Sequence, residues 1–253
     1  MDKNYYKSYY SLEREHWWFR ARLEILENLF RTDILPKATS SSKLAILNAG
    51  VATGATTTML EQYGAVTSLE YDKDCCQFLE ETLQMEVVNG SLTELPFADN
   101  SFDLVCAFDV IEHIKEHDLA VAEMKRVLRP NGRIFLTVPA FQFLWGEHDE
   151  INHHERRYTQ QMLVDVVAES GIKIERKSYF NFFLFFPIFL VRMLLKLRPA
   201  KKDGEHKSDF ETFKSGGIIN KMLYKLFGLE KGVLKHNINF PVGVSLFVIG
   251  VKE

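Results

Sequence analysis

The sequence has few cysteines and no apolar run long enough to cross a membrane. Its 253 residues include 3 cysteines, of which Cys75 and Cys76 are adjacent and Cys106 stands alone. This spacing excludes a disulfide framework and a paired-cysteine metal site, and it is typical of a reducing compartment. The most apolar run, residues 182–191, has ten residues, whereas a spanning helix needs about 20.

The sequence also lacks a dominant charge and a signal peptide. Lys and Arg number 31 and Asp and Glu 34, for a net charge of −3. The overall charge therefore gives no reason to expect nucleic-acid binding. Hydrophobic residues make up 46% and charged residues 26%, which excludes whole-chain disorder, collagen and coiled coil. Residues 1–18 are polar and aromatic, so we expect no signal peptide and a cytoplasmic location.

Apolar, strand-like segments alternate with segments of helical period. Strands are predicted at residues 43–48, 65–70, 85–88, 102–108, 133–138, 172–178 and 242–251, and helices at 53–63, 74–83, 119–128 and 160–170. This alternation predicts an α/β fold, with a doubly wound parallel sheet covered by helices on both faces. Such sheets bind ligands beyond the carboxyl ends of their strands, where the strand order reverses.

Two regions lie outside the alternation. Residues 1–40 are rich in aromatic side chains, contain a predicted helix at 20–30 and form a predicted N-terminal helical lid. Residues 179–241 form a predicted helical insertion before the last strand. The predicted core therefore consists of residues 41–178 together with 242–253.

The insertion is rich first in phenylalanine and then in basic residues. Six phenylalanines occur between residues 180 and 189, and residues 192–235 hold 11 Lys and Arg against 5 Asp and Glu. A phenylalanine-rich helix flanked by lysines is typical of an interfacial helix on anionic lipid. We therefore expect peripheral contact with the inner face of a membrane through residues 182–198. A cap over the substrate, packing on the core and a homodimer contact stay open.

The first predicted strand runs into a turn that contains glycine. In the segment from Asn48 to Gly54, Gly50 allows a tight turn close to a ligand, and Gly54 allows a helix to pack against the strand. Glu70 ends the second strand, where a carboxylate accepts hydrogen bonds from ribose hydroxyls. A solvated acid at a strand end is the alternative. The pattern favours a nucleoside pocket between the two strand ends.

Five segments together resemble the motifs of a known family. They are LNAGVATG (47–54), SLEYD (68–72), GSLTELPF (90–97), FDLVCAFDVIEH (102–113) and RVLRPNGRIFLTVP (126–139). In this order they resemble class I S-adenosylmethionine-dependent methyltransferases. The resemblance implies a Rossmann-like sheet of seven strands, mostly parallel with the last strand antiparallel. It also implies S-adenosylmethionine as the cofactor, released as S-adenosylhomocysteine.

The resemblance also assigns residues to the cofactor. They are Asn48, Ala49, Gly50, Val51, Gly54, Glu70, Tyr71, Ser91, Leu92, Phe108 and Asp109. Glu70 binds the ribose hydroxyls, and Tyr71 packs against adenine. Two positions depart from the family pattern: Asn48 stands where an acid is common, and Ser91 where an aspartate is usual. Each loss costs on the order of 1 kcal/mol of affinity.

Two segments resemble bacterial methyltransferases of the type 11/12 group, whose genes often accompany saccharide or lipid modification. One is the HWWFR segment, which ends at Arg20, and the other is residues 144–159. The predicted lid and acceptor residues are Trp17, Trp18, Arg20, Trp145, His148, Arg157 and Tyr158. The aromatic side chains exclude water, and Arg20 reaches an acidic group. Packing of these aromatics on the domain and surface ion pairs are the alternatives.

Two histidines are candidate general bases. An imidazole titrates near neutrality, which suits deprotonation of a hydroxyl or an amine, so we predict His113 or His154 in this role. His148, Asp149 and His153 have the composition of a metal site. Methyl transfer from a sulfonium needs no Lewis acid, so we expect no metal.

We expect an enzyme that transfers a methyl group to an oxygen, or a nitrogen, of a small-molecule, saccharide or lipid-linked acceptor. The protein has to hold the nucleophile in line with the methyl group and exclude water. One alternative is a non-catalytic module of the same fold that binds an adenosine ligand. The other is an NAD-dependent oxidoreductase, since Gly50, Ala52 and Ala55 loosely imitate a dinucleotide fingerprint. The missing middle glycine argues against the oxidoreductase.

Overall fold

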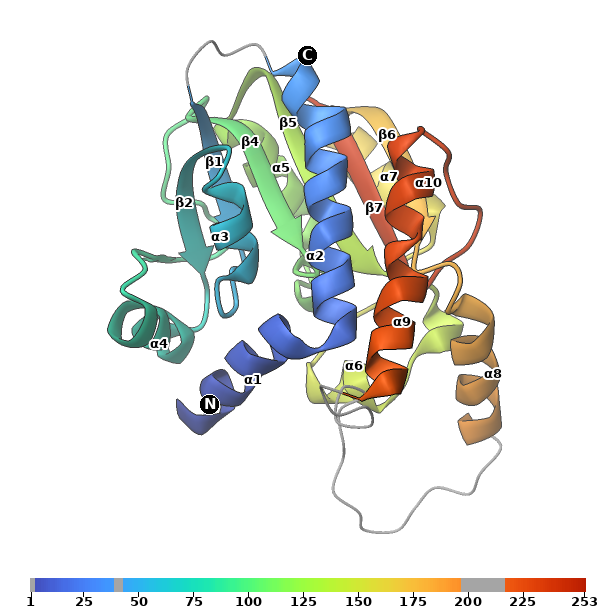
Figure 1. Ribbon diagram of the computed structural model, residues 1–253. Coiled ribbons are helices and arrows are strands. Elements are labelled where there is room, and N and C mark those ends of the chain that lie inside the picture. Colours follow the sequence, from blue (N-terminus) through green and yellow to red (C-terminus); the bar gives the residue numbers. More distant parts are fainter. Residues whose placement is uncertain (1–2, 39–42, 197–216) are drawn as a thin grey trace.

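A seven-stranded sheet forms the centre of the computed structural model, which describes residues 3–38, 43–196 and 217–253 (Figure 1). The strands are β1 (Leu44–Ala49), β2 (Gly64–Glu70), β3 (Val88–Asn89), β4 (Phe102–Phe108), β5 (Leu128–Pro139), β6 (Lys173–Phe180) and β7 (Ser245–Val251). Their order is β3-β2-β1-β4-β5-β7-β6. Neighbours from β3 to β5 are parallel, and β7 is antiparallel to β5 and β6. The predicted fold class is confirmed.

Helices cover both faces of this sheet. They are α1 (Lys3–Glu15), α2 (Trp17–Leu29), α3 (Ala55–Leu60), α4 (Lys73–Leu83), α5 (His117–Val127), α6 (Glu147–Ile151), α7 (Gln160–Glu169), α8 (Phe185–Lys196), α9 (Ile218–Gly228) and α10 (Glu230–Lys235). In Figure 1, α2, α3, α9 and α10 lie in front of the sheet, and α5 and α7 lie behind it. Shorter π- and 3-10-helical turns occur at Phe30–Ile34, Leu35–Lys37, Ile111–His113 and Gln142–Leu144.

Local signals in the sequence set several element boundaries. Strand β4 has its predicted bounds. The Thr159 hydroxyl accepts a hydrogen bond from the Met162 amide at 3.2 Å and so caps α7, and Gly171 takes a φ of +81° beyond the end of that helix. Other boundaries differ: β3, α3 and β7 are shorter than predicted, β5 begins five residues earlier, and α2 begins three residues before the predicted helix. Helix α1 was not predicted.

The N-terminal helices and the insertion pack together on one face of the sheet. The Trp17 amide donates to the Asn220 side-chain oxygen at 3.2 Å, and the Trp17 ring meets the Phe227 ring edge-on at 6.2 Å. Lys231 forms an ion pair with Glu24 at 2.8 Å. The aromatic contact supplies most of the adhesion here, because exposed ion pairs contribute little. The division into lid, core and insertion stays a prediction.

A buried carboxylate ties the insertion to the end of β6. Glu230 is fully buried, and its two oxygens accept hydrogen bonds from the amides of Asn181 at 2.6 Å and Phe183 at 3.1 Å. These amides follow the last residue of the strand and have left the sheet ladder. Burial outweighs the hydrogen bonds and raises the pKa of Glu230 to about 7.

The raised pKa of Glu230 makes stability depend on pH in a defined direction. An acid with a higher pKa in the folded state binds more protons there, so the free energy of unfolding falls as pH rises from about 4.5 to about 7. The loss is about 1.4 kcal/mol per unit of pKa difference. Glu230→Gln lacks this contribution. Denaturant unfolding at several pH values should show the wild-type minus variant difference decreasing across that window, and a flat difference would contradict the assignment.

Candidate functional site

The turn after β1 lies close to the carboxyl ends of β2 and β4. Gly50 has a φ of +70°, and its amide donates to the Leu69 carbonyl at 2.8 Å. A Cβ at Gly50 would lie 2.4 Å from a methyl group of Val110, so a larger residue cannot fit without a shift. Ala52 also takes a left-handed φ, of +47°, and Gly54 follows at +85°. The turn thus stays open and presents its backbone at the edge of the sheet.

Glu70 is joined to this turn. Its carboxylate accepts hydrogen bonds from the amide of Ala52 at 3.1 Å and from the amides of Tyr71 and Asp72 at 2.9 and 3.1 Å. Burial raises the pKa of the Glu70 carboxyl, while the three amides favour its charged form. The adjacent Tyr71 side chain is 78% exposed. The acid and the exposed ring therefore flank the turn, and their roles toward ribose and adenine stay predictions.

The two positions that depart from the family pattern make local bonds. Asn48 is buried, and its amide nitrogen donates to the hydroxyls of Thr56 and Thr57, both at 2.9 Å. Its side-chain oxygen has no hydrogen-bond partner among the described residues. The Ser91 hydroxyl pairs with that of Thr93 at 2.7 Å. Asn48 thus braces α3 and still offers one unused buried acceptor.

Helix α1, which lies within the predicted lid region of residues 1–40, covers the turn, whereas the individual lid residues named from the sequence lie on α2 and beyond. The Glu13 carboxylate accepts a hydrogen bond from the Thr53 hydroxyl, and Arg14 donates to the Thr53 carbonyl at 3.1 Å. Tyr6 stacks on Phe78 of α4 at 5.9 Å. Figure 1 shows α1 at the end of the sheet to which the parallel strands point. No apolar stripe in the sequence reveals α1, because tyrosines supply most of the face that it turns to the protein.

The predicted lid residues of α2 have different partners from those expected. Trp17 is buried against the insertion rather than over the turn, whereas Trp18 is half-buried. Arg20 lies over the ring of Tyr224 at 4.8 Å. The arginine of α2 that lies at the carboxyl edge of the sheet is Arg22, two residues later, and it pairs with Asp109 of the protein itself.

An ion pair anchors α2 at the point where the strand order reverses. Arg22, which is buried, lies 2.7 Å from one oxygen of Asp109, and the Thr137 hydroxyl donates to the other at 3.1 Å. Asp109 follows β4 with a φ of +58°. Beside it, Phe108 is buried against Phe135. Asp109 therefore faces the edge, as predicted, whereas Phe108 and Leu92 belong to the core.

A cluster of acids and histidines lies next to Asp109. Ligand atoms of Glu112, His113 and His154 all lie within 4.8 Å of one another, and the two imidazole rings meet edge-on at 4.6 Å. His154 donates from Nδ1 to Asp149 at 2.8 Å, and Arg157 donates to the same oxygen at 2.8 Å. These partners hold the pKa of Asp149 well below its usual range, despite its burial.

Glu112 is the residue of this cluster that sequence reasoning missed. It is fully buried, and neither carboxyl oxygen has a hydrogen-bond partner within the described part of the chain. Burial and the nearby Asp109 carboxylate raise its pKa well above the usual range. The signal was present in the sequence, since Glu112 directly precedes His113 in the fourth motif.

Two predicted acceptor residues prove to be structural. Tyr158 is fully buried, and its hydroxyl donates to the Ile111 carbonyl at 3.3 Å and lies 2.8 Å from His117. Arg157 is buried on Asp149. The rings of Trp145 and His148 lie 6.5 and 5.9 Å from the ring of His154, so these two remain near the cluster.

The metal set considered from sequence, His148, Asp149 and His153, does not form. Asp149 is bonded to His154 and Arg157 instead, and His153 is exposed.

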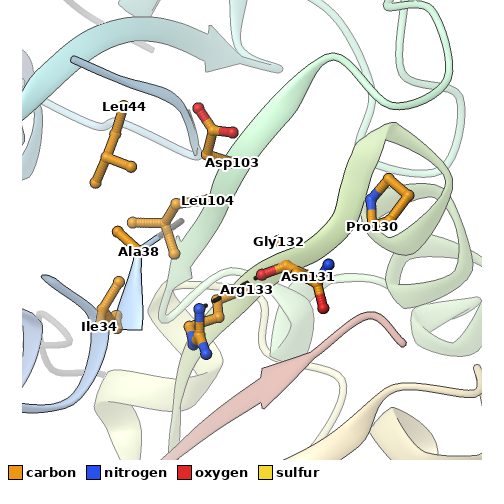
Figure 2. A pocket seen from close by; sticks show the side chains of 9 residues that line it. All are labelled: Ile34, Ala38, Leu44, Asp103, Leu104, Pro130, Asn131, Gly132 and Arg133. Atoms are coloured by element: carbon orange, nitrogen blue, oxygen red, sulfur yellow. Dashed lines mark hydrogen bonds between the residues drawn. The ribbon is translucent and has the colours of Figure 1, made fainter. Parts of the chain in front are cut away.

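A small cavity lies at the opposite edge of the sheet. Figure 2 shows its lining, which includes Leu44, Asp103 and Arg133 near the starts of β1 and β4 and within β5. Its volume of about 20 Å³ suits a water molecule and excludes a nucleoside. The cavity therefore has no part in the site at the carboxyl ends of the strands.

Comparison with known proteins shows which family the segments at this edge of the sheet resemble. Residues 47–136 match a family described as "Methyltransferase domain". The chain carries a class I S-adenosylmethionine-dependent methyltransferase domain. A protein of Mycolicibacterium smegmatis named as a "probable S-adenosylmethionine-dependent methyltransferase" is 27% identical over 168 residues, which is 65% of this chain and 62% of that protein. The demethylmenaquinone methyltransferase of Staphylococcus aureus (strain Newman) is 33% identical over 93 residues, 33% and 39% of the two chains.

Solved structures agree on the fold. Phosphoethanolamine N-methyltransferase 2 of Haemonchus contortus, crystallised with S-adenosylmethionine, has a TM-score of 0.53 and 16% identity, covering 90% of this chain and 52% of that one. The cyclase SpnF has a TM-score of 0.54 and 16% identity, covering 92% and 80%. A cyclase among these neighbours means that the fold alone does not set the reaction. The chain also spans only 62% and 57% of the first two curated relatives.

The site fits the cofactor of this domain, S-adenosylmethionine. The Glu70 carboxylate lies at the turn, where the family resemblance expects the ribose, Gly50 keeps the turn free of side chain, and the unpartnered oxygen of Asn48 is a buried acceptor beside the turn. The family match therefore decides for this cofactor over nicotinamide. The resemblance of the HWWFR segment to a bacterial subgroup stays a prediction.

The left-handed backbone at Ala52 predicts a stabilising substitution. This conformation costs a non-glycine residue about 1–2 kcal/mol, so Ala52→Gly should raise the free energy of unfolding by about 1 kcal/mol in urea denaturation. The control is Ala168→Gly, at an exposed position inside α7, which should lower it by about 0.5–1 kcal/mol. Equal losses at both positions would show that the turn is relaxed without glycine.

Proposed function

We propose that this protein transfers the methyl group of S-adenosylmethionine to an oxygen, or a nitrogen, of a lipid-linked acceptor. The observation that supports the reaction is the bonding of Glu70 to the turn after β1, beside Asp109, in a chain with a methyltransferase domain. The proposed cofactor site lies at the carboxyl ends of β1 and β4, where the strand order reverses. Ligands of doubly wound sheets bind at such a point.

The protein's own residues bind, orient and exclude water. Glu70 accepts hydrogen bonds from ribose hydroxyls, and the turn lets the cofactor approach the backbone. Helix α1, held on Thr53 by Glu13 and Arg14, closes the pocket against water. When bound, the cofactor would supply a methyl group activated by its sulfonium, and these residues would hold it in line with the acceptor's lone pair.

The acceptor's proton leaves through the His113 and His154 cluster. Both histidines were predicted as candidate bases, and they lie together beside Asp109. Asp149 accepts from Nδ1 of His154, which fixes the ring and leaves Nε2 as the free nitrogen. The same arrangement orients bases in other active sites, where a third group holds the imidazole.

A non-catalytic module is the weaker alternative. It rests on Asn48 and Ser91, which lack the charges of the family pattern. Both side chains are accommodated by neighbouring hydroxyls. Their losses, each on the order of 1 kcal/mol, weaken cofactor binding without removing the pocket.

Loss of the Glu70 charge should weaken cofactor binding. Glu70→Gln keeps the shape of the side chain, and a charged hydrogen bond contributes about 1.5–3 kcal/mol, so affinity for S-adenosylmethionine should fall by about 10- to 100-fold in isothermal titration. Glu61→Gln, at an exposed position after α3, is the matched control and should bind as the wild type does. An unchanged affinity in Glu70→Gln, or wild-type binding of NAD instead, would overturn the proposal.

The lipid-linked acceptor is supported by an exposed apolar surface on α8 and α9. On α8, Phe186, Leu190, Val191 and Leu194 are each 53–63% exposed, and Ile218 and Met222 are exposed on α9. Figure 1 shows α8 and the start of α9 toward the same end of the molecule as the carboxyl ends of the parallel strands. No helix among the described residues is long and apolar enough to cross a membrane. An interfacial contact suits such short amphipathic helices.

Removing apolar side chains from α8 should weaken membrane contact. With anionic vesicles, the wild type should sediment, and the double variant Phe186→Ser, Leu190→Ser should sediment several-fold less, because about 0.8 kcal/mol is lost per buried methylene. Leu119→Ser, on an exposed leucine of α5, is the control and should behave as the wild type. Equal sedimentation of the wild type with and without vesicles would contradict the lipid proposal. It would have no bearing on the proposed methyl transfer.

A further inference from the structure

Within the described residues, neither the charged nor the protonated form of the Glu112 carboxyl group is compensated. Both of its oxygens are buried and without hydrogen-bond partners among the described residues. The nearby cations are already paired, since Arg22 lies on Asp109 and Arg157 on Asp149. Protonation removes the charge but adds a buried O–H that also needs an acceptor. An unsatisfied buried group of this kind costs about 1–3 kcal/mol, and more when charged.

Two imidazoles face the same space as this carboxylate. Each of Glu112, His113 and His154 offers a ligand atom within 4.8 Å of the other two. Two nitrogens and one carboxylate oxygen form a set that binds divalent first-row metals, with Zn²⁺ and Fe²⁺ as typical occupants. Magnesium is less suited, because it prefers oxygen ligands.

The far side of each imidazole is already held. His154 uses Nδ1 for Asp149, at 2.8 Å, and His113 forms a hydrogen bond with the backbone of Asn152. Metal-binding histidines are oriented in this way, with one ring nitrogen on a carboxylate or carbonyl and the other on the ion. A purely structural cluster would not require two oriented histidines together with an unpaired carboxylate such as that of Glu112.

The cluster is open on one side. Glu112 is buried at its base, whereas His113 is exposed. An ion can therefore enter from solvent, and rotation of the exposed ring can close the ligand set. With three protein ligands, a fourth position remains for water or an acceptor oxygen.

We propose that Glu112, His113 and His154 form a binding site for a divalent transition-metal ion, represented here by Zn²⁺. The ion would compensate the buried charge of the Glu112 carboxylate. Its binding does not require S-adenosylmethionine. Its use in catalysis rests on the proposed function: with the ion bound, His113 and His154 serve as ligands and no longer as bases, and because a metal ion lowers the pKa of a coordinated hydroxyl, the acceptor's proton would pass to solvent. The ion then acts on the acceptor and not on the sulfonium, which needs no Lewis acid.

The test is direct binding of Zn²⁺ to the full chain after treatment with a chelator. Isothermal titration without cofactor should show one ion per chain. Glu112→Gln, which keeps the shape of the side chain, and His113→Ala, at an exposed position, should each weaken binding by about 100-fold or more, since even outer-shell partners contribute about 10- to 100-fold. Co²⁺ should give a ligand-field spectrum in the wild type that both variants lose.

The control is the neighbouring exposed histidine. His153 has a φ of +53°, which asparagine also tolerates, so His153→Asn should bind Zn²⁺ as the wild type does. Zn²⁺ bound equally by Glu112→Gln, absence of stoichiometric binding, or a preference for Mg²⁺ would overturn the proposal. Glu70→Gln should retain Zn²⁺ and lose S-adenosylmethionine affinity, which separates failure of the metal site from failure of the methyltransferase function.

Discussion

The ion pair between Arg22 and Asp109 sets the geometry of the whole carboxyl edge. Arg22 is buried and Asp109 is partly exposed, and the pair joins a helix near the start of the chain to the end of β4, while Thr137 of β5 holds the other carboxylate oxygen. Removing Asp109 is costly, because the charge of the buried Arg22 would be left uncompensated. With α2 held there, α1 projects across the turn after β1, and α9 and α10 pack along the outer side of α2.

Buried carboxylates mark the places where irregular backbone leaves the sheet. Glu230 accepts the free amides beyond β6, and Asp149 gathers His154 and Arg157 after β5. Each is satisfied by donors from segments that regular secondary structure does not hold. Glu112 differs, since it is as deeply buried but has no donor in the described residues. That contrast is why it, and not the others, points to a missing positive charge.

Much of the site could be predicted because its signals are local. Glu70 follows a strand directly, and His113 lies one short turn after another, so parallel pairing alone brings them to one edge. The roles of Arg20 and Arg22 could not be separated in this way, because two residues along a helix point to opposite sides and the choice depends on how α2 docks. The burial of Tyr158 depends likewise on His117, which is 41 residues away.

The packing of α2 against α9 has a consequence for the order in which the chain folds. The Trp17 amide and its partner Asn220 are separated by 203 residues. On a ribosome that adds residues one by one, the sheet strands β1 to β5 emerge long before the segment that completes the N-terminal layer. Contacts of such long range form late and slow the final step of folding. In a nascent chain, the strand ends that form the cofactor site are therefore complete before α9 packs against α2.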